Sequence, residues 1–143
     1  MNQENKVVVS RSKIGGELPI VASEILDGCL YSGFFGTLDS ARTKSITDTV
    51  LNLADSREAL YIIIDLSNVE IIDSAVAVHL VTVAESLRLV GTDVIFCGIK
   101  PFIAQSISKA GITITNSSFS KNLNTALKEV LKRMGMEIVP IKQ

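Results

Sequence analysis

The residues best placed for chemistry in this chain are Asp73 and Ser74, which set a carboxylate beside a hydroxyl. Both residue types are favoured at helix starts, because their side-chain oxygens accept hydrogen bonds from backbone N–H groups that the helix leaves unpaired. A hydroxyl at the first helical position also lies near the positive end of the helix dipole, where an added anion is stabilised. The pair is interpreted as the functional centre of the chain, with a plain helix start as the alternative.

The segments around this pair place Ser74 at the end of a buried strand. The run of residues 60–66 is short, rich in isoleucine and apolar on both faces, which is typical of a central parallel strand. A polar loop is predicted over residues 67–70, followed by a helix that Asp73 caps and Gly91 ends. Because partners usually meet open α/β sheets at the carboxyl ends of their strands, we expect Ser74 at such an edge.

The rest of the chain predicts further strands and helices in alternation. Asp27 and Gly28 favour a tight hairpin turn, and Thr37 or Asp39 is expected to cap the first helix. The patterns predict strands over residues 18–26, 29–35, 94–98 and 112–115, and helices over residues 41–59, 101–110 and 123–134, the last capped by Ser120. The fold class is therefore α/β: a mixed β-sheet that begins with a hairpin and continues through parallel βαβ crossovers, with helices packed on one face.

One domain is expected from the length of 143 residues and the hydrophobic content of 47%. We expect residues 18–134 to form it, after an N-terminal arm (1–17) that could add an edge strand and before a C-terminal tail (135–143). The net charge of -1 and the dispersed Lys and Arg residues argue against nucleic acid as a partner. Apolar runs are far shorter than the roughly 20 residues of a membrane-spanning helix, and the N-terminus lacks a signal-peptide pattern. A cytoplasmic protein with no membrane partner is therefore expected.

Few residues permit catalysis or cofactor binding. The single histidine, His79, lies in an apolar helical run and is expected to be structural or exposed, so no metal site is predicted. The nine glycines form neither GxGxxG nor GxxxxGKS/T, so no nucleotide cofactor is predicted either. Cys29 and Cys97 lack CxxC spacing and are interpreted as reduced core residues, with a disulfide as the alternative.

Two catalytic alternatives use Asp65. It ends a predicted strand and Lys100 follows a later one, an arrangement similar to response-regulator receiver domains, in which such an aspartate is phosphorylated with magnesium. The first strand, however, ends with Glu24 and Asp27, two separated acids, rather than with the acidic pair that holds the metal in a receiver. The other alternative is a small enzyme that uses Asp65 and Asp73 as paired carboxylates in a closed pocket.

Several spaced motifs resemble those of STAS domains, the anti-sigma-factor-antagonist family. They are Asp65-Leu-Ser67, Ile72-Asp73-Ser74, Arg88-Leu-Val-Gly91, residues 94–101 and Ile103-Ala-Gln-Ser106. Together with Gly36-Thr-Leu-Asp-Ser-Ala-Arg42, they are similar to the stressosome branch, the RsbS and RsbR proteins. The resemblance covers about residues 18–134, nearly the whole predicted fold.

The resemblance implies a non-catalytic, phosphorylatable scaffold that regulates bacterial stress signalling by partner switching. An RsbT-like serine/threonine kinase would bind the domain, phosphorylate Ser74 and be released, and a PP2C-type phosphatase would reverse the modification. Further implied partners are STAS paralogues in a large complex, or a second copy in a homodimer. Ser106 matches a region where RsbR-like domains carry a second phosphosite.

The resemblance also implies a partner-binding surface around Ser74. Its residues are Ser67, Asn68, Glu70, Asp73, Ser74 and Ala75. A phosphate on Ser74 adds roughly -1.5 to -2 charges. We expect this charge beside Asp73 and within reach of Asp65 and Glu70, so that a docked partner is repelled.

Two roles within the family stay open. The short chain, which leaves no room for an N-terminal sensor domain, and the serine at position 74 favour an RsbS-like role, whereas residues 36–42 are more similar to RsbR proteins and favour a sensorless paralogue. The alternative function is a stand-alone anti-sigma-factor antagonist that binds an anti-sigma kinase. The size of the assembly separates the two functions, because only a stressosome protein enters a large complex with paralogues.

Overall fold

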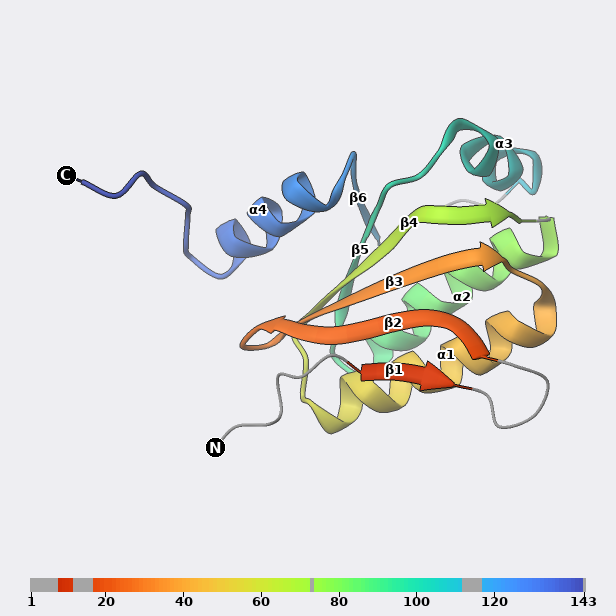
Figure 1. The fold of residues 1–143 in the computed structure, drawn as a ribbon, viewed down its shortest axis with the longest axis horizontal. Coiled ribbons are helices and arrows are strands. Elements are labelled where there is room, and N and C mark those ends of the chain that lie inside the picture. Colours follow the sequence, from red (N-terminus) through yellow and green to blue (C-terminus); the bar gives the residue numbers. More distant parts are fainter. Residues whose placement is uncertain (1–7, 12–16, 73, 112–116, 143) are drawn as a thin grey trace.

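The structure, a computed structural model, describes residues 8–11, 17–72, 74–111 and 117–142. Three strands come first in these ranges, and helices and strands alternate after them (Figure 1). The strands are β1 (Val8–Arg11), β2 (Glu17–Leu26), β3 (Cys29–Thr37), β4 (Tyr61–Ile71), β5 (Asp93–Cys97) and β6 (Ser118–Ser120). The helices are α1 (Ser40–Ser56), α2 (Ser74–Leu89), α3 (Pro101–Lys109) and α4 (Leu123–Arg133).

The described strands form one sheet in the order β1-β2-β3-β4-β5-β6, so each strand pairs with its neighbour in sequence. β1, β2 and β3 are antiparallel, and β3 to β6 run parallel. Gly28 turns the β2–β3 hairpin at a φ of 83°, a conformation that favours glycine. The predicted fold class, a mixed α/β sheet with an N-terminal hairpin and parallel crossovers, is confirmed. The strand predicted at residues 112–115 lies outside the described residues, and the last described strand is β6.

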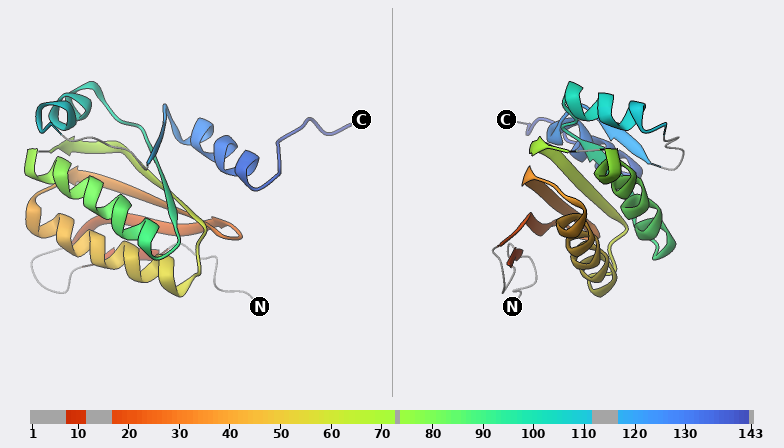
Figure 2. Two further views of the ribbon diagram at one scale, coloured as in Figure 1. Left: turned by 180° about the vertical axis from the view of Figure 1, so that it is seen from behind. Right: turned by 90° about the vertical axis from the view of Figure 1, so that its right-hand side faces the viewer.

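The two faces of the sheet carry different helices. Alternate residues of a strand point to opposite faces, so Ile62 and Ile64 of β4 join the core under α1, α2 and α3, whereas Ile63 packs with Ala126 and Val130 of α4. Figure 2 shows α1 and α2 side by side across the first face. The prediction that the helices pack on one face is therefore right for α1, α2 and α3 and wrong for α4. Cover on both faces explains why β4 is apolar on both sides.

β4 is longer than predicted and contains two shifts of register against β3. Gly33 pairs with Asp65 but Phe35 pairs with Asn68, so β4 has one extra residue between these pairs, and a second shift follows before Thr37. Extra residues of this kind are β-bulges, which bend a strand without ending it. The polar loop predicted after Leu66 is therefore wrong, because β3 runs alongside this segment and pairs with it.

Capping residues fix where two of the helices begin. Asp39, one of the two residues predicted to cap α1, does so, and its Oδ1 accepts a hydrogen bond from the Arg42 backbone N–H at 2.8 Å. α4 is capped by Asn122, whose Oδ1 accepts from the Thr125 backbone N–H at 2.9 Å. The prediction of Ser120 as this cap is wrong, because Ser120 still belongs to β6.

Candidate functional site

The carboxyl ends of β3 and β4 lie together at one edge of the sheet, because these strands run parallel and Thr37 pairs with Ile71. α1 and α2 begin at this edge, beside the arrowheads of β3 and β4 in Figure 1. The helix start predicted at Ser74 is confirmed, since α2 begins at this residue. Asp73 and the side chain of Ser74 lie outside the described residues, so the roles predicted for both side chains stay predictions.

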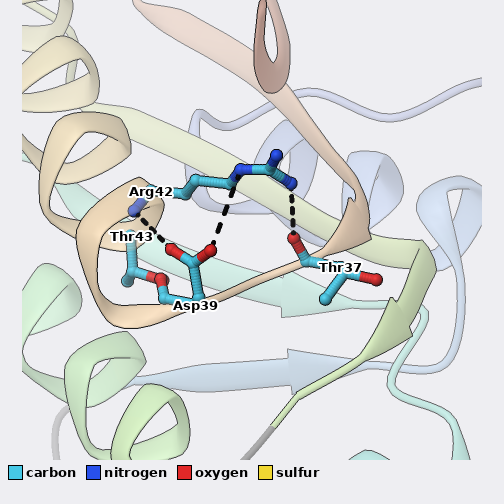
Figure 3. Close-up of polar contacts among 4 residues, drawn as sticks. All are labelled: Thr37, Asp39, Arg42 and Thr43. Carbon is cyan, nitrogen blue, oxygen red and sulfur yellow. Dashed lines mark hydrogen bonds and ion pairs between the residues drawn. The ribbon is translucent and has the colours of Figure 1, made fainter. Parts of the chain in front are cut away.

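The turn between β3 and α1 adjoins the end of β4, since Thr37 pairs with Ile71 in the sheet. Figure 3 shows the contacts that hold this turn. Arg42 donates a hydrogen bond from Nη1 to the Thr37 carbonyl at 3.3 Å, and its Nε lies 3.9 Å from Asp39 Oδ2. The Thr43 hydroxyl donates to the Asp39 carbonyl at 2.7 Å. The ion pair is about half exposed and adds only about 0–1 kcal/mol of stability, so its main effect is to order the turn.

Asp65 lies in the middle of β4 and is 8% exposed. The Tyr31 hydroxyl donates to its Oδ2 at 2.8 Å, and Ser67 donates twice to its Oδ1, from the hydroxyl at 2.7 Å and from the backbone N–H at 3.0 Å. These three donors satisfy the carboxylate within the fold, as a buried charge requires. Asp65 is therefore a structural group. This contradicts the receiver alternative, in which the carboxylate must be reachable by a phosphoryl donor.

Asp65 also lies far along β4 from Ser74, so its charge adds little to the repulsion expected from a phosphate on that residue. It stands six residues before Ile71, the last residue of β4, which at about 3.3 Å per residue corresponds to roughly 20 Å along the strand. Glu70, by contrast, is exposed near the end of the strand. Of the two acidic residues expected close to the phosphate, Glu70 lies near the edge of the sheet and Asp65 does not.

The predicted partner-binding residues that the structure describes lie on both faces of the sheet. Asn68 and Glu70 are exposed, and Ser67 is half-buried. Val69 is fully buried in the core under α1 and α2, so its neighbours Asn68 and Glu70 point to the opposite face of the sheet. Ala75 is exposed in the first turn of α2, on the helix side. A partner that touches all of these residues must therefore straddle the edge of the sheet.

His79 and Ser106 occupy ordinary positions on their helices. His79 is half-buried and lines, with Lys44 of α1, a groove of about 420 Å³ between α1 and α2. The Ser106 hydroxyl donates to the Phe102 carbonyl one turn earlier in α3 at 3.0 Å, a common bond of helical serines. The second phosphosite proposed for Ser106 stays a prediction.

Both cysteines are free and buried, so the interpretation as reduced core residues is confirmed. Burial, followed by the charge of Glu24, raises the pKa of the Cys29 thiol to about 11. Burial, followed by the charge and hydrogen bonding of Asp65, raises the pKa of the Cys97 thiol to about 12. Because the thiolate is the reactive form, neither thiol is a nucleophile near neutral pH.

Neither a metal site nor a membrane-spanning helix is found among the residues that the structure describes. Over these ranges, no three His, Cys, Asp or Glu side chains are grouped as ligands of a metal ion would be. No helix in the same part of the chain has the length and apolar character needed to cross a membrane.

The contacts of two polar side chains, Tyr31 of β3 and Arg42 of α1, were not predicted from the sequence. The contact of Tyr31 with Asp65 depends on the register of β3 against β4, which no local pattern reveals. The sequence did contain a signal for the contact of Arg42 with Asp39, because the two residues are three positions apart, the spacing of neighbours on a helix surface.

Comparison with known proteins places these features in a family. The family model of the STAS domain matches residues 21–126. The RsbT co-antagonist protein RsbRA of Bacillus subtilis (strain 168) is 36% identical over 125 residues, which are 84% of this chain and 46% of that protein. The chain thus spans less than half the length of this relative.

Solved structures share the fold. RsbS of Moorella thermoacetica, carrying a glutamate in place of a serine, matches with a TM-score of 0.69 and 22% identity over 83% of this chain and 98% of that chain. A chain in the solved structure of the stressosome, described as a signal integration and transduction hub, matches with a TM-score of 0.61 and 21% identity. The match covers 82% of this chain and 98% of that chain. At these identities the likeness shows the fold alone.

Proposed function

Since the chain belongs to the STAS domain family, we propose that it is a non-catalytic, phosphorylatable scaffold of a bacterial stressosome, with Ser74 as its phosphoacceptor. The identity of 36% to an RsbT co-antagonist protein supports the pathway, and the fold shared with a stressosome chain supports the kind of assembly. The observation that carries the choice of Ser74 is its position as the first residue of α2, at the carboxyl edge of the sheet.

Phosphorylation of Ser74 would act by adding charge at this edge. The phosphate brings roughly -1.5 to -2 charges, and the N–H groups and dipole at the start of α2 would stabilise it within the domain. A partner docked over the edge would meet this charge together with Glu70. A loss of about 1.4 kcal/mol in docking free energy weakens binding tenfold. A doubly charged group removed from water costs more than this, so the docked partner is released.

The partners in this proposal follow from the relatives. The kinase is of the RsbT type, because the similar proteins are named RsbT co-antagonists. A PP2C-type phosphatase resets the site, and STAS paralogues complete the complex. The identity to RsbRA favours an RsbR-like role over the RsbS-like role that the short chain favoured, in agreement with residues 36–42.

The test is phosphorylation of the purified chain by an RsbT-type kinase and ATP, with the modified residue located by peptide mass mapping. Ser74→Ala should abolish incorporation. The chain offers a matched control, because Ser40 is also the first residue of a helix at the same edge and also follows an aspartate, Asp39. Ser40→Ala should leave incorporation unchanged, and Ser106→Ala shows whether the second site is used.

A binding measurement tests whether a negative charge at position 74 releases the kinase, which the phosphorylation assay alone does not show. Ser74→Asp should weaken kinase binding at least tenfold and change the melting temperature by less than about 2 °C, because the proposal requires the side chain of Ser74 to reach solvent. Phosphate retained in Ser74→Ala at another residue would reassign the site. Unchanged kinase binding by Ser74→Asp would argue against release by repulsion.

A further inference from the structure

The charge of this chain is distributed unevenly between α4 with the segment that follows it and the rest of the sequence. Residues 121–142 contain five basic and two acidic residues, a net charge of +3. The whole chain contains 14 basic and 15 acidic residues, so the remaining positions contain 9 basic and 13 acidic residues, a net charge of -4. The C-terminal part is thus positive in a chain that is otherwise acidic, and a positive surface attracts anionic partners.

Two of these cations, Lys128 and Lys132, are exposed and lie one turn apart on α4. Arg133 differs from them, because its Nε lies 2.9 Å from Glu129 Oε2 and its Nη2 donates to the Ser118 hydroxyl at 2.7 Å. Among the residues that the structure describes, neither lysine forms an ion pair. Both charges are therefore available to a partner.

Exposed apolar side chains follow these lysines in the described part of the chain. Met136, Ile138, Val139 and Ile141 are 47%, 64%, 62% and 87% exposed. In Figures 1 and 2 this segment, residues 135–142, leads away from the sheet. We call it the tail. Contiguous exposed apolar residues of this kind mark interaction surfaces in proteins.

The direction in which the tail leaves α4 is fixed by backbone hydrogen bonds. Gly135 has a φ of 80°, its N–H donates to the Lys132 carbonyl at 3.0 Å, and the Met136 N–H donates to the Leu131 carbonyl at 2.8 Å. This is the Schellman pattern, in which a glycine in the left-handed conformation ends the helix and turns the chain. The base of the tail is therefore held relative to α4 before any partner arrives, which lowers the entropy lost on binding.

A groove of about 480 Å³ lies between α4 and the base of the tail. Its lining residues are Lys128, Leu131 and Lys132 of α4 and Gly135, Met136, Glu137 and Ile138 of the tail. We call these residues the α4–tail groove. Two lysines and one glutamate make its lining net positive, and apolar side chains lie among the charged ones. A concave surface that combines apolar and charged side chains suits a polypeptide segment with both kinds of residue.

We propose that the α4–tail groove binds an acidic, amphipathic segment of a partner protein that is not a copy of this chain. Two copies of a net positive surface repel each other, so a second copy does not fit the groove. Carboxylates of the partner segment face Lys128 and Lys132. If the segment is a helix, acidic residues four positions apart match the spacing of the two lysines, because both helices have the same rise per turn. The inference is independent of the phosphorylation proposed for Ser74.

The other groove residues set the strength and the orientation of this contact. Apolar side chains of the partner cover Leu131, Met136 and Ile138. Because exposed ion pairs contribute little to affinity, these apolar contacts hold the segment and the lysines select its charge. Glu137 repels acidic residues, which restricts them to the α4 side of the groove. An interface this small is a weak and transient one, for which we expect a dissociation constant on the order of 10 µM.

A synthetic probe helix tests the proposal with the full chain. The probe has about 14 residues, or four turns, with glutamates on one face and leucines on the other, and carries a fluorescent label. Its binding is measured by fluorescence anisotropy. The variant Lys128→Glu with Lys132→Glu should bind the probe at least tenfold more weakly than the unmodified chain. The same variant should bind a probe with lysines in place of the glutamates at least tenfold more tightly than the unmodified chain does.

Matched controls separate this site from the overall charge of the protein. Lys100→Glu with Lys109→Glu makes the same change of charge at exposed lysines around α3 and should leave the affinity within about threefold at 0.15 M salt, where charges more than about 8 Å apart are largely screened. Ile138→Asp should weaken binding at least tenfold, whereas Leu89→Asp, at an exposed leucine of α2, should not. Circular dichroism confirms that each variant is folded.

Four results would overturn the proposal. The first is an acidic probe that binds the unmodified chain no more tightly than the lysine probe does, and the second is an affinity that survives the double substitution of Lys128 and Lys132. The third is self-association of the unmodified chain in sedimentation velocity runs that Ile138→Asp abolishes, which would assign the groove to a second copy. The fourth is tighter binding to phosphatidylglycerol vesicles than to the acidic probe, which would assign it to a lipid surface.

Discussion

Tyr31→Phe tests whether the carboxylate of Asp65 is held by the fold. The substitution removes one hydroxyl and keeps the aromatic ring, which packs against the cluster under α4. The lost hydrogen bond, 2.8 Å long, joins a phenol to a carboxylate that is only 8% exposed. Ser67 continues to bind Oδ1, so the change affects Oδ2 alone.

The expected cost follows from the charge on the acceptor. Hydrogen bonds to charged groups contribute about 1.5–3 kcal/mol, and the lower end applies here because Tyr31 is only partly buried and water can replace part of the bond. For a chain of 143 residues, a loss of about 1.5 kcal/mol lowers the melting temperature by roughly 5 °C.

Urea unfolding followed by circular dichroism measures the free energy of unfolding of the variant. The denaturant midpoint should fall with an unchanged slope, since the surface exposed on unfolding is the same. Tyr61→Phe is the matched control, because Tyr61 packs in the same cluster and should change stability by less than about 0.5 kcal/mol. A Tyr31→Phe variant as stable as the unmodified chain would refute the structural role given to this bond.

Three further outcomes are expected. Gly98→Ala should cost several kcal/mol of folding free energy in urea unfolding, because its Cβ would lie 2.7 Å from Asp65 Oδ1 at a φ of 71°. Asn122→Ala should cost about 1 kcal/mol in the same assay by removing the cap of α4, and a loss confined to fraying of the helix end would contradict this. Stability should fall as the pH rises above about 9, since the folded chain keeps the protons of Cys29 and Cys97 that the unfolded chain releases; a thermal melt series should show less of this fall in the double alanine variant.

The elements with strong local signals could be predicted from the sequence. The hairpin at Asp27 and Gly28, the start of α2 at Ser74 and the Pro101 start of α3 each depend on a few adjacent residues. The same holds for the buried strand that follows Leu60, whose residues up to Ile64 form a continuous apolar run. Such features are set by turn geometry, capping and burial on both faces, which a linear pattern records.

The features that were missed depend on partners distant in the sequence. Residues after Leu66 look like a loop because they are polar, and only the pairing of β3 with Asn68 and Val69 keeps them in the sheet. α4 packs on the second face of the sheet, against Ile63. In a continuous apolar strand, the sequence does not show that the residues facing away from α1 and α2 are covered by another helix. The inward position of Asp65 likewise depends on Tyr31, a contact between residues 34 positions apart.

The strand order limits aggregation of this protein through the edges of its sheet. Since neighbours in sequence are neighbours in the sheet, the two outermost strands of the described sheet are β1 and β6, with four and three residues, while β2, β3, β4 and β5 each have a strand on either side. At these two outermost strands, a strand from a second molecule thus finds few backbone groups on which to add. Molecules of this protein then associate through side-chain surfaces rather than through added strands. Single substitutions in such a surface change its binding affinity without opening the sheet.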